Sequence, residues 1–458
     1  MRKKLLVMLM TLCMLVVLAA CGNVDNTEEA EQSAETVEEN EDGEDEPASD
    51  SDTAEETSDD TQNEEQDESR TEEQEDEQGQ SQDGSQSEEQ PASNPNLIVD
   101  AEYANLQEST GFEFESNGDG TCTLTGIGDC TDSDIVIPEK SPEGDTVTMI
   151  AEDAFYRAED ISSIIFAGRT MELDSGAFES CEAERIVITG CDMVIGEYAF
   201  SYCDDVEEVY ISGSNIEVDN YAFYNTGNDI VMEIVNCSGT LKEDAFQSCA
   251  VLQLTISEST LELDEYVFSY CDDMEAVAFD NCTVEIEAYA FYNSGDDASV
   301  TFTNSEININ DKAFQSCSLA TLNITGCETV LGEYTFSYCE DLTEVIIGAG
   351  NIEIGSYCFY NCTSLVNVSI AADSEDDSLA LVIDDKAFQS CSVQNVIIGR
   401  GNTEIGDYAF SYCEDLVSVD IRGVLADMED YVFYNCPEEL VILYNGESYD
   451  GESIENAM

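Results

Sequence analysis

A short motif that recurs thirteen times constrains the fold of this chain more than any other feature. Each copy is a residue such as Ala followed by Phe, and successive Phe residues lie 22 or 23 positions apart, with one step of 29. The motif Phe residues are Phe155, Phe178, Phe200, Phe223, Phe246, Phe268, Phe291, Phe314, Phe336, Phe359, Phe388, Phe410 and Phe433. Such a period is typical of solenoids, in which each repeat buries its apolar face only against its neighbours. The long step contains an insertion rich in Asp, Glu and Ser, from Ala371 to Leu379.

The repeats also follow a second, longer period. Three repeat types alternate, and Phe200, Phe268 and Phe336 each begin the sequence Phe-Ser-Tyr-Cys at intervals of 68 residues. The first two copies of the motif fit less well, as terminal repeats often do. The pattern indicates duplication of a three-repeat block.

Each repeat has the same apolar skeleton. Val206, Val209 and Ile211 follow the spacing of a leucine-rich-repeat core, and Ile216 and Val218 alternate with the period of a strand. Parallel strands from successive repeats would stack about 4.8 Å apart. The sequence therefore predicts a mostly β solenoid of about thirteen repeats over residues 151–445, with a cap at 96–150 and a tail at 446–458.

The segment from Ile405 to Ile421, Ile-Gly-x-Tyr-Ala-Phe-x-x-Cys-x-x-Leu-x-x-Val-x-Ile, resembles the BspA-like leucine-rich repeat of bacterial surface proteins. Residues Cys122 to Cys130 and the run Ile135 to Pro138 are similar to the amino-terminal cap of that family. The resemblance covers about 112–445. It implies a concave parallel sheet, turns or single-turn helices near each Phe, and a role in surface adhesion or partner binding without enzyme activity. Most copies lack the Pro that usually begins the loop between the two strand segments.

The amino terminus has the features of an export signal. Arg2 to Lys4 are basic, an apolar run follows from Leu5 to Leu18, and Leu18-Ala19-Ala20-Cys21 completes the segment. This ending resembles a bacterial lipobox, which implies removal of residues 1–20 and lipidation (palmitate) of Cys21. We therefore expect an exported protein that is lipid-anchored to the bacterial cell membrane and exposed at the surface.

Residues 21–95 should form a disordered acidic linker behind this lipidated Cys. From residue 22 to residue 90 there are 30 acidic residues and one basic residue, Arg70. Such a segment cannot bury enough apolar area to offset its chain entropy. It would act as a stalk, although a solubilising filler fits the same sequence.

The cysteines favour a ladder of free thiols. Ten of them lie three residues after a motif Phe, in a column that also holds Ala158, Thr226 and Ser294, so the column requires a small group. Stacked side chains at strand spacing lie further apart than a disulfide allows. Cys122 and Cys130 lie across an expected hairpin in the cap, where a disulfide and two free thiols are both compatible with the sequence.

Tyrosines supply the candidate binding residues. Tyr202, Tyr270, Tyr338 and Tyr412 lie two residues after a motif Phe, and Tyr210 is the one aromatic residue in the outward column of the strands, which we expect to run from Val187 through Val231 to Ile397. Exposed Tyr gives rigid amphipathic contact area at interfaces. A second Tyr column, two residues before Phe, is expected mainly to cover the edge of the solenoid.

Composition excludes several functions. The chain has no His, and its formal charge of −90 would repel nucleic acid. No metal site or cofactor is predicted. Ca²⁺ could bind the recurring acidic pairs such as Asp204-Asp205, but the sequence favours solvated charge as their explanation. The acidic residues recur uniformly and include no unique pair of carboxylates that would suggest glycosidase chemistry.

The leading hypothesis is an adhesion or binding module for an unknown extracellular protein or glycan, and the alternative is a structural acidic spacer or cation-binding coat protein without a discrete ligand.

Overall fold

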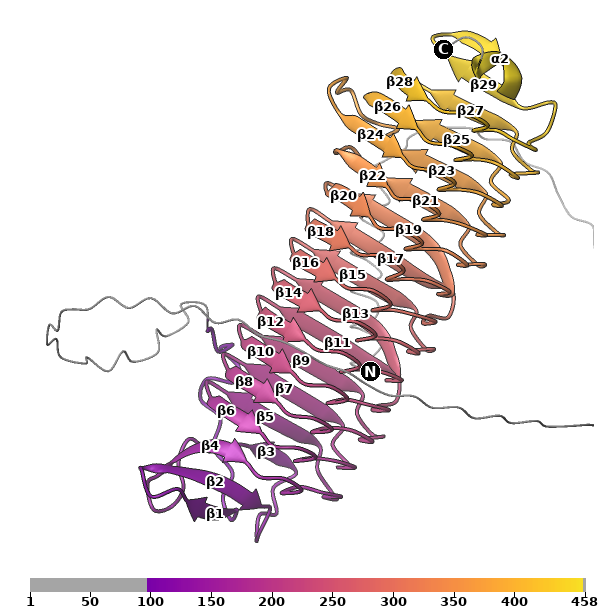
Figure 1. The fold of residues 1–458 in the computed structure, drawn as a ribbon. Helices are drawn as coiled ribbons and strands as arrows, with labels where there is room; N and C mark the ends of the chain where they lie inside the picture. Colours follow the sequence, from indigo (N-terminus) through magenta and orange to yellow (C-terminus); the bar gives the residue numbers. More distant parts are fainter. Residues whose placement is uncertain (1–96, 456–458) are drawn as a thin grey trace, which may run out of the picture. The chain divides into compact units, whose positions relative to one another are not determined.

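The computed structural model describes residues 97–455 of the chain, which form an elongated stack of short coils (Figure 1). The export signal, the lipidation at Cys21 and the acidic linker predicted from the sequence lie outside these residues. Each coil contributes one strand to each of two sheets, and a turn around the motif Phe closes it. The predicted solenoid of about thirteen repeats is therefore confirmed.

The first sheet, called sheet A, has fifteen strands, and its strand order follows the order of the coils. Its strands are β1 (Glu113–Ser116), β2 (Thr121–Gly126), β4 (Thr146–Ile150), β6 (Thr170–Leu173), β8 (Asp192–Ile195), β10 (Asn215–Val218), β12 (Ser238–Leu241), β14 (Thr260–Leu263), β16 (Thr283–Ile286), β18 (Glu306–Ile309), β20 (Glu328–Leu331), β22 (Ile352–Ile354), β24 (Ala380–Ile383), β26 (Asn402–Ile405) and β28 (Val424–Met428).

The second sheet, called sheet B, also has fifteen strands. They are β3 (Asp134–Val136), β5 (Ser163–Ala167), β7 (Arg185–Thr189), β9 (Glu208–Ser212), β11 (Ile230–Val235), β13 (Val251–Ser257), β15 (Ala276–Asp280), β17 (Ala298–Thr303), β19 (Leu319–Thr325), β21 (Glu344–Ile347), β23 (Asn367–Ile370), β25 (Asn395–Ile398), β27 (Ser418–Ile421), β29 (Val441–Tyr444) and β30 (Glu447–Tyr449). The helix α2 (Gly451–Glu455) follows β30.

Period-two alternation decides which side chains enter the core. In β14, Leu261 and Leu263 are buried while Thr260 and Glu262 are exposed, and most strands of sheet A repeat this pattern. One continuous apolar cluster runs from Phe112 to Ile454 between the sheets and the turns. The sequence predicted that Val231 would stand beside Tyr210 in the outward column of sheet B. In the structure Glu233 pairs with Tyr210, so that prediction was wrong by two residues.

The motif Phe residues form an unbroken ladder through the core. All twelve successive pairs are stacked, with ring centroids 4.5–5.9 Å apart. Phe359 and Phe388, which flank the 29-residue step, are 4.9 Å apart like the others. The insertion therefore leaves the stack as an outer loop and does not change the coil spacing.

The segment around each motif Phe is a turn, without a single-turn helix in the described repeats. The residues two before and two after each Phe both have positive φ, as in Tyr198 (57°) and Tyr202 (58°) around Phe200. This conformation is uncommon for residues other than Gly and costs conformational energy. Hydrogen bonds between coils offset that cost, because the Phe200 amide donates to the Ala222 carbonyl (2.7 Å) and the Tyr202 amide to the Tyr224 carbonyl (3.0 Å).

An antiparallel strand pair lies at each end of the stack. Strand β1 pairs antiparallel with β2 at the amino-terminal end, and β30 pairs antiparallel with β29 at the other. Ile454 of α2 is fully buried against the last coil. Strands β1 and β2 lie in the region expected to form the cap (96–150), and β30 and α2 lie in the region expected to form the tail (446–458).

Candidate functional site

Four clusters of four tyrosines recur along the turn face of the solenoid, one for each three-coil block. We call them tyrosine clusters 1 to 4: Tyr198, Tyr202, Tyr221 and Tyr224; Tyr266, Tyr270, Tyr289 and Tyr292; Tyr334, Tyr338, Tyr357 and Tyr360; and Tyr408, Tyr412, Tyr431 and Tyr434. Each cluster spans two neighbouring coils. The three-repeat period of the sequence thus places one tyrosine cluster in every three coils of the solenoid.

The rings within a cluster have a fixed geometry. In cluster 1, Tyr198 stacks on Tyr221 with centroids 5.4 Å apart and planes 7° apart. Tyr224 meets both Tyr221 and Tyr202 edge to face, at 5.7 and 5.6 Å. The equivalent stacked pairs in clusters 2, 3 and 4 are 5.1, 4.7 and 5.2 Å apart. Such aromatic pairs hold one another in place and contribute about 0.5–1.5 kcal/mol each beyond area burial.

The structure places four of the five predicted binding tyrosines at equivalent positions, one in each cluster. Tyr202, Tyr270, Tyr338 and Tyr412 are 43–44% exposed, although each has a ring packed edge-on against it. The acidic pairs follow them closely, as Asp204-Asp205 follow Tyr202. Each exposed ring is therefore held by its neighbouring ring and is followed in the sequence by two acidic residues. The tyrosines two before Phe are more covered in clusters 1 to 3, in agreement with the expected edge-covering role.

Tyr210, the fifth predicted residue, belongs to a different environment. Its hydroxyl donates to Asp100 Oδ2 (2.7 Å), and its ring lies 6.4 Å from that of Tyr103. The backbone of Ile98 and Asp100 is also bonded to this part of sheet B. The chain's own residues 98–103, at the start of the cap region, thus cover the ring, and burial raises the pKa of Tyr210 to about 12. Tyr210 does not belong to tyrosine clusters 1 to 4, whose side of the solenoid we call the tyrosine face.

A charged residue follows the stacked pair of each of the first three clusters, in the turn of the next coil. This residue is Asp244 after cluster 1, Lys312 after cluster 2 and Lys386 after cluster 3. Lys312 Nζ lies 5.3 Å from the centroid of the Tyr289 ring, and Lys386 Nζ lies 4.7 Å from that of Tyr357. Lys386 also donates to the Tyr357 hydroxyl oxygen at 2.6 Å. Two clusters therefore already bind an ammonium group from within the chain.

Electrostatics at cluster 1 differ from those at clusters 2 and 3. The hydrogen bond with the Asp244 carboxylate, together with burial, raises the pKa of Tyr221 to about 12. By contrast, the hydrogen bond with Tyr357 raises the pKa of Lys386, which keeps the ammonium charged. The same position in the repeat thus carries opposite charges in different blocks.

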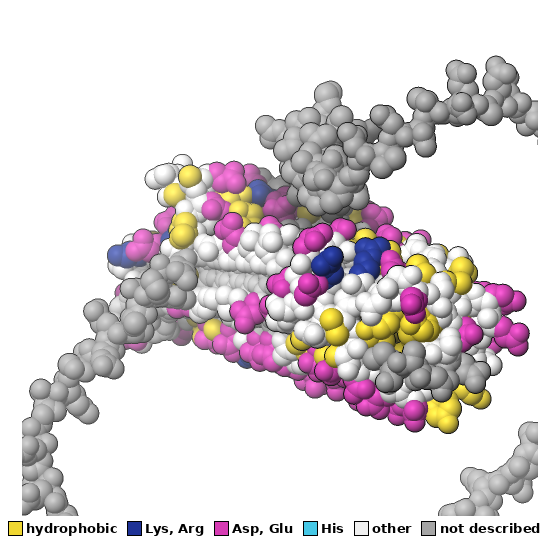
Figure 2. Space-filling view, turned by 90° about the horizontal axis from the view of Figure 1, so that it is seen from above, with side chains coloured by type: hydrophobic (Ala, Val, Ile, Leu, Met, Phe, Trp, Pro, Cys, Tyr) yellow, Lys and Arg dark blue, Asp and Glu magenta, His cyan; other side chains and the backbone are white. Residues whose placement is uncertain are grey.

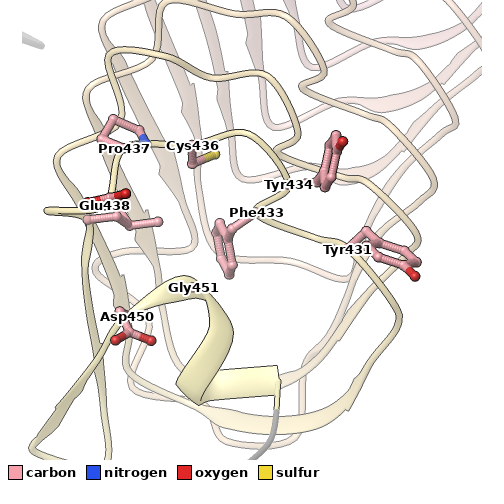
Figure 3. Close-up of a pocket in the computed structure, with 9 residues that line it drawn as sticks. Tyr431, Phe433, Tyr434, Cys436, Pro437, Glu438, Asp450 and Gly451 are labelled. Carbon is pink, nitrogen blue, oxygen red and sulfur yellow. The ribbon is translucent and has the colours of Figure 1, made fainter.

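A pocket at the carboxyl-terminal end of the solenoid, which sequence reasoning missed, adjoins cluster 4 (Figure 3). It encloses about 400 Å³, and its lining consists of Tyr431, Phe433, Tyr434, Cys436, Pro437, Glu438, Leu440, Asp450 and Gly451. The aromatic residues come from the last motif turn, and Asp450 and Gly451 come from the start of α2. Because the chain folds back to close this pocket, no local sequence pattern could have predicted it.

The described cysteines all carry free thiols, and fifteen of the seventeen are buried. Cys122 points from β2 into the core and is 1% exposed, whereas Cys130 is partly exposed in the loop after β2. The structure therefore holds no disulfide between them, and their pairing stays a prediction. In the described part of the chain, no group of three or more Cys, Asp or Glu side chains is arranged to hold a metal ion.

The surface is strongly acidic. Figure 2 shows Asp and Glu side chains over much of the visible face and few Lys or Arg. After residue 90 the sequence has 73 acidic and 9 basic residues. Within residues 97–455, no helix is long and apolar enough to span a membrane.

Fold and surface together define a class of protein: a parallel-stranded solenoid of leucine-rich-repeat type with a periodic aromatic face. The family model described as "BspA type Leucine rich repeat region" matches residues 130–253, 261–376 and 381–453, which is more than half of the chain. The chain therefore belongs to the BspA-type leucine-rich-repeat family, as the resemblance at Ile405 to Ile421 suggested.

Three solved structures are similar to this chain at low sequence identity. A leucine-rich repeat protein from Bacteroides ovatus ATCC 8483 is 22% identical over 74% of this chain and 88% of that one, with a TM-score of 0.44. A leucine-rich cell surface protein from Faecalibacterium prausnitzii A2-165 is 19% identical over 74% and 89%, with a TM-score of 0.28. The pneumococcal vaccine antigen PcpA is 14% identical over 75% and 94%, with a TM-score of 0.27. No curated protein matches the chain.

Proposed function

We propose that this chain is a lipid-anchored protein of the bacterial cell surface whose solenoid binds protein or glycan partners through the tyrosine face. One observation carries the binding role. Tyr202, Tyr270, Tyr338 and Tyr412 recur at one position of the three-coil block, each about 43–44% exposed and each braced by a neighbouring ring. Rigid exposed tyrosines lose little conformational entropy on binding and are enriched in binding surfaces.

The repetition favours a partner that is itself extended or repetitive. Several equivalent weak contacts along one rod raise the apparent affinity for a partner that engages them together. The excess of acidic residues favours partners that are basic or bridged by cations, with binding that weakens as salt rises.

The binding experiment uses the purified full-length protein in detergent, screened against extracellular-matrix proteins and glycans at physiological salt. A saturable partner should bind the variant Tyr202→Ala/Tyr270→Ala/Tyr338→Ala at least tenfold more weakly. The matched control replaces exposed apolar residues elsewhere, Val330, Ile346 and Val417, by Ala. Equal affinity of the Tyr variant and the native chain would contradict the proposal, and the absence of any saturable partner would favour the acidic-spacer alternative.

The anchor is tested separately, because Cys21 lies outside the described residues. Export and lipidation are supported by the basic, apolar and small-residue order of residues 2–21. In the producing cells, Cys21→Ala should release the protein into the medium or leave it unprocessed. Unchanged membrane retention and unchanged mass of the mature chain would contradict lipidation.

A further inference from the structure

The lysines that lie on clusters 2 and 3 show which ligand a tyrosine cluster accepts. In both, the coil that follows the stacked Tyr pair supplies a Lys whose ammonium lies 4.7–5.3 Å from the ring centroid of the second Tyr. A cation over the face of an aromatic ring is attracted by the negative potential of that face. These two contacts are an internal template for the recognition of an ammonium group.

Cluster 4 has the same stacked pair, Tyr408 and Tyr431 (5.2 Å), but no coil of the described solenoid follows it. After β29 the chain turns back into β30 and then α2. Tyr431 is consequently 51% exposed, and Tyr434 is 48% exposed. The place that a lysine-bearing turn takes at clusters 2 and 3 is left open at cluster 4.

The pocket beside cluster 4 has the lining that an ammonium-bearing side chain requires. Phe433, the last ring of the Phe ladder, lies between Tyr431 and Tyr434 on one side and Cys436, Pro437 and Glu438 on the other (Figure 3). The aromatic surface suits the apolar stem of a lysine. The Glu438 carboxylate supplies negative charge at the opposite wall, and Asp450, which accepts a hydrogen bond from the Ser453 amide (2.7 Å), adds to it.

We propose that this carboxyl-terminal pocket binds a lysine side chain presented by a partner protein, in the way that Lys312 and Lys386 bind to clusters 2 and 3. A volume of about 400 Å³ is within the range of small-ligand pockets. The inference rests on the proposed function only in taking the partner to be a protein. It concerns the end of the solenoid, whereas the proposed binding face runs along its length.

The test measures binding of a fluorescent (Gly-Lys)₄ peptide to the full-length protein in detergent at physiological salt. Tyr431→Ala and Glu438→Gln should each raise the dissociation constant about fivefold or more, since one cation–π or charge contact of this kind is lost. Glu439→Gln removes the same charge one residue further along and does not line the pocket, so it should change the constant less than twofold. The peptide acetylated on its lysines should bind at least tenfold more weakly.

Two results would overturn the proposal. Equal weakening by Glu438→Gln and Glu439→Gln would mean that only the general negative field attracts the peptide. Unchanged binding by Tyr431→Ala would mean that the Tyr431 ring does not bind the ammonium group. Circular dichroism of this variant is the control for its folding. The variant with Ala at Tyr202, Tyr270 and Tyr338 keeps cluster 4 intact and should bind the peptide normally, so failure of the pocket and failure of the binding face are separate outcomes.

Discussion

The thiol of Cys203 donates a hydrogen bond to the carbonyl oxygen of Phe178, 3.1 Å away in the preceding coil. Equivalent bonds run along the solenoid, including Cys271 to Phe246 (3.3 Å) and Cys339 to Phe314 (3.2 Å). Where the column holds Thr226 or Ser294, the hydroxyl does the same, and Thr226 Oγ1 donates to the Phe200 carbonyl (2.6 Å). After Ala158 in the first copy, the column therefore holds small side chains that can donate a hydrogen bond, and not only small apolar groups.

Replacing Cys203 tests this role. Cys203→Ala leaves the buried Phe178 carbonyl with the Cys181 amide (3.1 Å) as its one remaining donor and should lower the free energy of unfolding by about 0.5–1.5 kcal/mol, whereas Cys203→Ser keeps the second donor and should lower it by less. The measurement is the midpoint of chemical denaturation. Cys358→Ala is the control, because Cys358 occupies the column before Phe where most copies have Ala. Equal losses in Cys203→Ala and Cys203→Ser would refute a donor role.

The same thiols should make the solenoid sensitive to alkali. Burial raises the pKa of Cys181, Cys249 and Cys317 to about 12, whereas thiols in the unfolded chain have a pKa of about 8.5. Above that pH the unfolded state has lost protons that the folded state keeps, so the free energy of unfolding falls as the pH rises. Denaturation midpoints should be level from pH 6 to about 8 and decrease steadily above it. A midpoint that rises above pH 9 would contradict the burial of protonated thiols.

Chemical labelling tests the redox state of the cysteines. Unfolded protein that has not been reduced should be alkylated at every described cysteine, including Cys122 and Cys130, because all of them are free thiols in the structure. In the native state, Cys130 and Cys436 should react first, since they alone of the described cysteines are partly exposed. Mass spectrometry of the peptides gives both results. An unlabelled Cys122–Cys130 pair would establish the disulfide that the sequence allows.

Much of this fold could be predicted because each coil repeats a local pattern. The spacing from Phe200 to Phe223 fixes one coil, and the alternation at Ile216 and Val218 identifies a strand. Thr226 and Ser294 in the cysteine column also carried a signal for the donor role, because hydroxyl and thiol groups share the ability to donate a hydrogen bond. Their small size alone predicts only that the column is tightly packed.

Other features depend on contacts between distant segments. Tyr210 looked like an exposed strand residue, but Asp100 and Tyr103 cover it across more than a hundred positions of sequence. The pocket beside Tyr431 exists because α2 returns to the last coil. The positive φ of Tyr202 was also not expected from its residue type, although Asn225 at the equivalent place in the next coil is a residue that tolerates this conformation.

Phe268 tests the cooperativity of the Phe ladder. Its fully buried ring stacks on Phe246 (4.9 Å) and Phe291 (5.3 Å), so Phe268→Ala removes two stacks and leaves a cavity in the middle of the solenoid. The expected loss is about 3–5 kcal/mol. Because each coil is stabilised by its neighbours, the two halves should then unfold in separate steps. Tyr270→Ala, two residues away and half-exposed, loses only the edge-on contact with Tyr292 (5.7 Å) and should lower stability by about 1 kcal/mol without splitting the transition. A single unshifted transition for Phe268→Ala would contradict the nearest-neighbour account.

Deleting residues 373–378 from the insertion tests whether this loop lies outside the stack. The rings of Phe359 and Phe388 are 4.9 Å apart, within the 4.5–5.9 Å range of the ladder, and β22 still pairs in parallel with β24. The deletion restores a spacing close to that of the other repeats and removes one exposed ion pair, Asp377 with Arg400 (3.3 Å), which contributes at most about 1 kcal/mol. A shorter loop also costs slightly less entropy to close. The melting temperature should therefore change by only a few degrees, and loss of cooperative melting would show that the insertion supports the coils on either side.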